Sequence, residues 1–158
     1  MRFIKYGLYI LAILVLQTVI FPRLNFFGAL PDLVLVSVIA GAIAGEALPS
    51  NVFAAALALS QDLLAAGPYL NTIIKIIVNN IAGRLHDGFV GDDYALAAGL
   101  VALFTPLQAI VEGLIVYFFF GRQFSPAYFV FRLAAETVYN LLLLPLIFPL
   151  VKALNDAE

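Results

Sequence analysis

Long apolar stretches, separated by short polar or proline- and glycine-containing segments, fill almost the whole chain. The first stretch runs from Phe3 to Phe21 and contains a single charged residue, Lys5. Because a membrane-spanning helix needs roughly 20 apolar residues, stretches of this length predict transmembrane helices. The prolines, glycines and charges between them predict six spans, at about 3–21, 32–48, 51–66, 69–85, 95–120 and 128–152.

Local signals predict where some of these helices begin and end. Pro22 should end the first span, because proline lacks the N–H that a helix uses. Asp32 should cap the second span, with its carboxylate near the positive helix end. The fourth span is the most polar, since it contains Lys75 and Arg84. An interfacial helix is the alternative there, although the many isoleucines of 73–81 favour a span.

Composition supports a membrane protein and excludes several classes of function. The chain of 158 residues is 64% apolar and 11% charged, whereas soluble domains are about 45–50% apolar and about 25% charged. We therefore expect an all-α integral membrane protein, with residues 1–158 forming one transmembrane domain. The net charge of −2 leaves no basic patch for nucleic acid. With no Cys and one His, we expect no metal, no cofactor and no enzymatic activity.

The basic residues near the span ends predict the orientation in the membrane. The first apolar stretch is too long for a cleaved signal peptide, so we interpret it as a retained span. With six spans, four basic residues lie on the side of the termini, against two or three on the other side. This bias predicts a multi-pass membrane protein with both termini in the cytoplasm. A five-span alternative would put loop 83–93 and the C-terminus on opposite sides.

Polar residues recur at helical spacing within the predicted spans. Asn71, Lys75 and Asn79 stand four apart and should share one helix face. Charged groups inside a bilayer usually face the bundle interior or a cavity. Counting from the span ends places five charged residues in the outer half of the membrane: Asp62, Lys75, Glu112, Arg132 and Glu136. Two interpretations remain open, namely buried pairs that fix helix register, with Asp62 bound to Lys75, or an outward-facing pocket for a ligand or a partner's polar side chain.

Small and aromatic residues supply the candidate surfaces for a partner. Gly41, Ala44 and Gly45 form a small-residue face on the second span, and such faces let helices approach closely in lipid. Packing within the protein is the alternative interpretation of the same face. The next candidates are aromatic residues of the loops on the opposite side of the membrane: Phe26, Phe27, Phe118 and Phe119.

Several motifs together resemble the rod shape-determining protein MreD family. The resemblance rests on their order and spacing over nearly the whole chain. The matching residues are Leu16-Gln17-Thr18-Val19-Ile20-Phe21-Pro22, Leu24, Gly28, Pro31-Asp32-Leu33, Gly41, Gly45, Gln61-Asp62-Leu63-Leu64, Gly67, Tyr139-Asn140, Pro145 and Pro149. The chain departs from the family at 46–60, where alanines replace the usual glycines.

The resemblance implies a non-enzymatic component of the bacterial cell-elongation machinery. Members of the family bind the single-span scaffold MreC, and through it they serve the RodA–penicillin-binding-protein synthase and the MreB filaments in peptidoglycan synthesis. Their fold resembles the substrate-binding subunits of energy-coupling-factor transporters, so a small-molecule-binding transporter subunit is the alternative function. The first span lacks the Ala-x-x-x-Ala face of those subunits, because only Ala12 is present there, with Leu8 and Leu16 four residues away.

Overall fold

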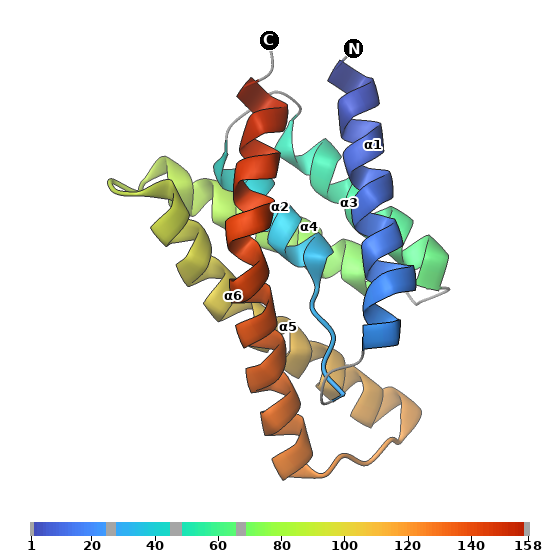
Figure 1. Ribbon diagram of the computed structural model, residues 1–158. Coiled ribbons are helices and arrows are strands. Elements are labelled where there is room, and N and C mark those ends of the chain that lie inside the picture. The colour runs from blue at the N-terminus through green and yellow to red at the C-terminus, as the bar shows by residue number, and fades with distance from the viewer. Residues whose placement is uncertain (1, 25–27, 45–48, 66–68, 157–158) are drawn as a thin grey trace.

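The computed structural model describes residues 2–24, 28–44, 49–65 and 69–156, and these residues form helices joined by short loops (Figure 1). The prediction of an all-α protein is confirmed for this part of the chain. The helices, in order, are α1 (Arg2–Val15), α2 (Leu33–Ile43), α3 (Ser50–Ala65), α4 (Leu70–Asp87), α5 (Asp93–Phe120) and α6 (Pro126–Asp156). A π-helical turn, η1 (Leu16–Ile20), and a 3-10 turn, η2 (Phe21–Leu24), extend α1.

Three helical segments in the described part of the chain are long and apolar enough to cross a membrane. They are Phe3–Leu24, Asp93–Phe120 and Pro126–Asn155, with mean hydropathies of 2.0, 1.8 and 1.8. The helix Leu33–Ile43 is apolar but shorter. These segments are compatible with a membrane protein surrounded by lipid. The six-span topology stays a prediction.

The first helix does not end at Pro22, contrary to the prediction from sequence. It continues to Leu24 as η2. The π-helical turn before it has wider backbone spacing than an α-helix, and the 3-10 turn after it uses shorter hydrogen bonds. The Thr18 hydroxyl donates to the Leu14 carbonyl at 2.7 Å beside this irregular turn. The chain thus accommodates the missing N–H of Pro22 by changing helix type.

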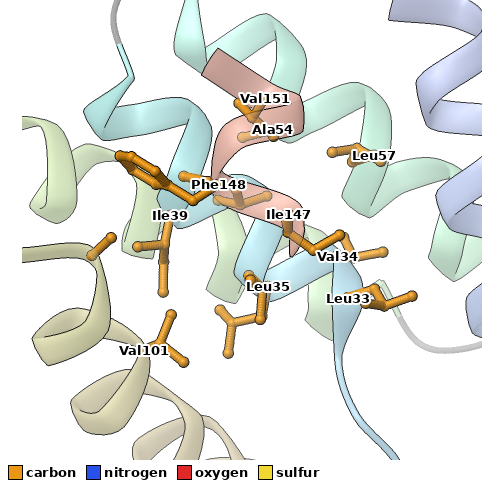
Figure 2. Packing of buried hydrophobic residues seen from close by; sticks show 14 of the residues in the cluster. Leu33, Val34, Leu35, Ile39, Ala54, Leu57, Val101, Ile147, Phe148 and Val151 are labelled. Atoms are coloured by element: carbon orange, nitrogen blue, oxygen red, sulfur yellow. The ribbon is translucent and has the colours of Figure 1, made fainter. Parts of the chain in front are cut away.

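Helix α2 is the centre of the protein. Ten of its eleven residues are buried, and helices α1 and α3 to α6 all contact it. A helix that is apolar all round needs neighbours on every side. Figure 2 shows Leu35 and Ile39 of α2 beside Val101 of α5 and Phe148 of α6 in this core. The helix ends at Ile43, before the predicted end at 48, and residues 45–48 lie outside the described part.

Helix α4 buries one face and exposes the other. Lys75, Val78 and Asn79 lie on the buried face, against α2 and α3. Ile73 and Ile77 are more than half exposed on the opposite face. Polar residues, both on the buried face and at the exposed C-terminal end, separate this 18-residue helix from the three apolar segments, and its length does not. The span over 69–85 and the interfacial helix both stay predictions from sequence.

The small-residue face of α2 packs inside the protein at Gly41, which agrees with the alternative interpretation of that face. Gly41 is buried, and a Cβ atom added there would lie 2.8 Å from Cδ1 of Phe53. The Phe53 ring is itself fixed by Tyr6 and Tyr9, whose centroids are 5.7 and 5.9 Å away. Ala44 is half-buried at the C-cap of α2. Gly45 lies outside the described residues.

The chain termini and the α5–α6 loop lie at opposite ends of the molecule (Figure 1). The Tyr6 hydroxyl donates a hydrogen bond to the Asn155 side chain, which joins the ends of α1 and α6. At the other end, α5 and α6 extend beyond the remaining helices. Phe118 and Phe119 are 74% and 81% exposed there, whereas the predicted candidates Phe26 and Phe27 fall outside the described residues.

Candidate functional site

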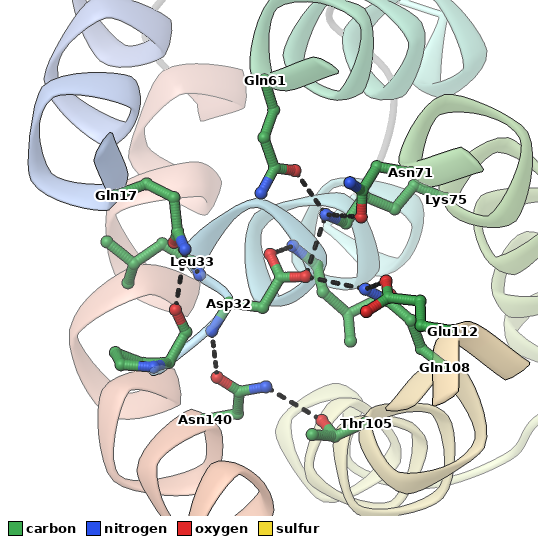
Figure 3. A network of polar contacts seen from close by, with 12 residues as sticks. Gln17, Asp32, Leu33, Gln61, Asn71, Lys75, Thr105, Gln108, Glu112 and Asn140 are labelled. Atoms are coloured by element: carbon green, nitrogen blue, oxygen red, sulfur yellow. Dashed lines mark hydrogen bonds and ion pairs between the residues drawn. The ribbon is translucent and has the colours of Figure 1, made fainter. Parts of the chain in front are cut away.

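A network of polar side chains centres on Asp32, at the start of α2 (Figure 3). Its Oδ1 accepts a hydrogen bond from the Leu35 N–H at 2.9 Å, which confirms the predicted N-cap. Its Oδ2 lies 2.9 Å from Lys75 Nζ and accepts from Gln108 Nε2 at 3.0 Å. One carboxylate therefore caps α2 and binds side chains of α4 and α5.

Lys75 is completely buried, and its ammonium group is surrounded by oxygen atoms. Besides Asp32, it donates to Gln61 Oε1 at 2.5 Å and to Asn71 Oδ1 at 3.4 Å. The predicted pairing of Lys75 with Asp62 is therefore wrong. The prediction compared only axial positions along a hairpin, whereas the rotation of α4 directs Lys75 toward the N-terminus of α2.

Asp62 has a different role, because it caps α4 from the neighbouring helix α3. Its carboxylate accepts from Asn71 Nδ2 at 2.9 Å, the Thr72 N–H at 2.8 Å and the Thr72 hydroxyl at 2.7 Å. The residue that precedes α4, Tyr69, has a left-handed backbone with φ of 57° and makes no side-chain cap. Asp62 thus satisfies a free N–H in the first turn of α4.

Replacing Asp62 with alanine should lower the free energy of unfolding by about 1–3 kcal/mol, because buried donors lose their acceptor. The melting temperature in detergent measures this loss. Asp87→Ala is the control, since Asp87 is exposed at the end of α4 and its removal should change stability by less than about 0.5 kcal/mol. Equal melting temperatures for the two variants would contradict the capping role.

Two amide side chains fix the segment that leads into α2. Gln17, on the π-helical turn, donates to the Pro31 carbonyl at 2.9 Å and accepts from the Leu33 N–H at 2.8 Å. Asn140 of α6 accepts from the Asp32 N–H at 2.8 Å and donates to Thr105 at 3.0 Å. With these contacts, every helix or its extension contributes a side chain to the network.

A charged cavity of about 130 Å³ lies between α5 and α6 and includes Glu112, Arg132 and Glu136 in its lining. The Glu112 carboxylate accepts from Gln108 Nε2 at 2.8 Å, so Gln108 connects it to Asp32. Arg132 Nε donates to Glu136 Oε1 at 2.7 Å, one turn apart on α6. Of the five charged residues predicted to share a polar interior, these three line one cavity. Lys75 and Asp62 connect to them through the network.

An apolar groove continues from this cavity toward the α5–α6 loop. Its volume is about 390 Å³, and it shares Gly113, Phe124 and Phe129 with the charged cavity. A Cβ atom on Gly113 would lie 2.8 Å from the Phe129 ring, so glycine permits the close approach of α5 and α6 here. The other residues that line the groove are Ile110, Leu114, Tyr117, Gln123 and Pro126.

Sequence reasoning missed the central role of Asp32 and the contribution of Gln17. Both residues carried a usable signal, because each is a polar side chain inside or at the edge of an apolar stretch that can bury it. In the described part of the chain, no group of three or more His, Asp or Glu residues could hold a metal ion. The arrangement can bind hydrogen-bond donors and cations inside an apolar bundle.

Comparisons of the chain with models of protein families, with curated proteins and with solved structures found no match.

Proposed function

We propose that this chain is a non-enzymatic component of the bacterial cell-elongation complex, located in the inner membrane with six spans and cytoplasmic termini. In this role it binds a single-span scaffold protein of the MreC type. Through the scaffold it serves the RodA–penicillin-binding-protein synthase, the MreB filaments and the maintenance of rod shape. The motifs that resemble the MreD family, from Leu16 to Pro149, support the proposal from the side of the sequence.

The structural observation that carries the proposal is that the Glu112 carboxylate lacks an ionic partner in the described part of the chain. Its carboxylate lies in a helix apolar enough to cross a membrane and accepts a hydrogen bond from the neutral Gln108. No described Lys, Arg or His forms an ion pair with it. Ionisable groups inside a bilayer are unfavourable unless they are paired. A donor side chain on a helix of another protein would supply the missing partner.

The groove beside Glu112 has the form that a helix would fill. Ile110, Leu114 and Tyr117 follow the spacing i, i+4, i+7 on α5 and are 41%, 52% and 51% exposed, so they form an apolar wall of the groove against which the apolar face of another helix can pack. The charged cavity of about 130 Å³ is small beside the roughly 300–1,000 Å³ of small-molecule pockets. By itself it suits one side chain, and the apolar groove of about 390 Å³ that continues from it would take the helix that carries this side chain.

Replacing Glu112 with leucine should lower recovery of the co-expressed scaffold at least about tenfold, since losing one partner of a buried interfacial charge pair costs about 2–5 kcal/mol. Affinity purification followed by mass spectrometry measures this recovery. The yield of monodisperse protein should not fall, because the variant removes a charge without an ionic partner in the described chain. Unchanged scaffold recovery would contradict docking at this cavity.

A cross-linking experiment locates the contact independently, because the chain contains no cysteine. A photoreactive group on a cysteine placed at Leu114 should form an adduct with the scaffold. The control is a cysteine at Leu8 of α1, which is similarly exposed, 61% against 52%. Adducts from Leu8 alone would place the partner on α1. Normal rod shape in cells that lack the chain would overturn the proposed function itself.

A further inference from the structure

Of the acidic side chains that the structure describes in the polar network and the charged cavity, most have their charge balanced within the protein. Asp32 forms an ion pair with Lys75 at 2.9 Å, and Glu136 forms one with Arg132 at 2.7 Å. Asp62 instead accepts hydrogen bonds of 2.9, 2.8 and 2.7 Å at the start of α4. Charged groups inside a bilayer are tolerated when they are balanced in these ways.

The remaining acid, Glu112, is not balanced by the described residues. Its Oε1 accepts from the neutral Gln108 at 2.8 Å (Figure 3), and no described Lys, Arg or His pairs with it. The residue is half-buried and lines the charged cavity, so a group that enters the cavity can reach it. Glu136 and Arg132 line the same cavity. Two carboxylates and one cation leave one negative charge in excess, which calls for one further cation.

The position of Glu112 along α5 sets the depth at which a partner's cation must lie. The residue stands about eight residues before the end of the helix at Phe120, which is about 12 Å along the helix axis. On α6, Glu136 stands about ten residues after Pro126, about 15 Å along the axis. The groove between these carboxylates and the α5–α6 loop is mostly apolar. The cation must therefore come from inside the apolar stretch of a helix and not from its end.

The lining of the cavity favours a guanidinium group over an ammonium group. A guanidinium carries several N–H donors in one plane and can serve two carboxylates at once. It is also more weakly hydrated than an ammonium group, so its burial costs less. Phe124 and Phe129 line both the cavity and the groove, with ring centroids 6.0 Å apart. Guanidinium groups stack on aromatic rings, so these rings suit an arginine side chain.

We propose that the helix that docks in this groove carries one arginine inside its apolar stretch, within about one helical turn of the level of Glu112. Its guanidinium donates to the Glu112 carboxylate and to that of Glu136, and it packs against Phe124 and Phe129. Apolar residues of the same helix fill the groove between the arginine and the α5–α6 loop. This inference rests on the proposed function, because it names the partner's chemistry at the same docking site.

Synthetic membrane-spanning peptides test the charge on the full chain, reconstituted in lipid nanodiscs. Each peptide is a leucine–alanine helix of roughly 20 residues with one central position that holds arginine or citrulline. Citrulline has nearly the shape of arginine but no charge. The arginine peptide should bind at least about tenfold more tightly, because close charge pairs at interfaces are strongly coupled. Equal binding of the two peptides would overturn the proposal.

Two further peptides test the kind of cation and its depth. A central lysine should bind severalfold more weakly than a central arginine, because the ammonium group is more strongly hydrated. An arginine at the end of the apolar stretch should bind no more tightly than the citrulline peptide. If lysine bound as tightly as arginine, the guanidinium assignment would be wrong. If the terminal arginine bound as tightly as the central one, the proposed depth would be wrong.

Glu112→Gln tests the carboxylate, since glutamine keeps the shape and an acceptor for Gln108. In this variant the arginine peptide should bind only as weakly as the citrulline peptide, with an unchanged melting temperature in detergent. Asp87→Asn is the matched control, because Asp87 is exposed at the end of α4. It removes the same charge and should keep the preference for arginine. A preference that persists in Glu112→Gln would contradict binding of the arginine at this carboxylate.

Failure of this inference and failure of the proposed function give different results. If the peptides bind equally while Glu112→Leu loses the co-expressed scaffold, a helix docks here without an arginine, and the inference is overturned. If the arginine peptide binds more tightly while Glu112→Leu recovers the scaffold normally, the cation site is supported and docking of the scaffold is contradicted.

Discussion

Replacing Lys75 with methionine should lower the free energy of unfolding by about 3–5 kcal/mol, because the variant leaves the Asp32 carboxylate without its countercharge. The Lys75 side chain is completely buried, and that of Asp32 is 20% exposed. Their ion pair of 2.9 Å joins α2 to α4 at the centre of the polar network. The melting temperature and the yield of monodisperse protein in detergent measure the loss.

The double variant of Asp32→Asn with Lys75→Met distinguishes two causes of the loss. One is the charge left without a partner, and the other is the absence of the side chain itself. Asparagine keeps an oxygen for the Leu35 N–H, so the cap of α2 persists. With both charges removed, stability should recover most of the loss, since replacing a whole buried pair is often neutral. Equal losses in both single variants and the double variant would contradict the pair.

A second ion pair, less buried than that of Lys75 and Asp32, is the control for how much burial adds to the stability lost with a charge. Arg132 and Glu136 lie one turn apart on α6 at 2.7 Å, and the Arg132 side chain is 45% exposed. Arg132→Met should therefore cost less than Lys75→Met, about 1–3 kcal/mol, because only Glu136, which is 12% exposed, loses its donor. A loss as large as that of Lys75→Met would show that burial does not decide the difference.

Replacing Gly41 with leucine should destabilise the protein by at least about 1–3 kcal/mol, because it overpacks the core. The new Cβ would lie 2.8 Å from Phe53 Cδ1. Phe53 cannot move away easily, since Tyr6 and Tyr9 pack against its ring. The yield of monodisperse protein and the melting temperature in detergent should both fall.

Gly7→Leu is the matched substitution on α1, where the added Cβ meets nothing within 4 Å. It should leave yield and melting temperature unchanged. If Gly41→Leu were as stable as Gly7→Leu, the small-residue face of α2 would be free, and it would return as a docking surface for the scaffold helix. The difference in melting temperature between the two variants thus measures the effect of leucine at an internal contact against its effect on an open surface.

The polar network has a structural purpose apart from any partner. Between helices in lipid there is little hydrophobic drive for association, so packing and polar contacts decide which faces meet. Asp32 binds side chains from α4 and α5, and its N–H binds α6 through Asn140. The network therefore fixes the rotation of these helices around α2.

The sequence by itself determined the features that depend on neighbouring residues along the chain. Apolar stretches predicted the helices, and Asp32 was predicted to cap α2 because an N-cap needs only a side-chain oxygen near the first turn. The spacing of Asn71, Lys75 and Asn79 predicted that they share a face of α4, because a helix repeats every 3.6 residues. These signals are local and do not require knowledge of any other helix.

Only the tertiary structure decided which residues meet across helices. Lys75 binds Asp32 rather than Asp62, because the rotation of α4 about its own axis selects the partner. Gly41 serves internal packing because Phe53 of α3 lies against it, and Gln17 reaches the start of α2 because the π-helical turn directs it there. Spacing along a helix defines a face, but the direction of that face depends on packing between helices. That packing is the sum of many contacts between residues far apart in sequence.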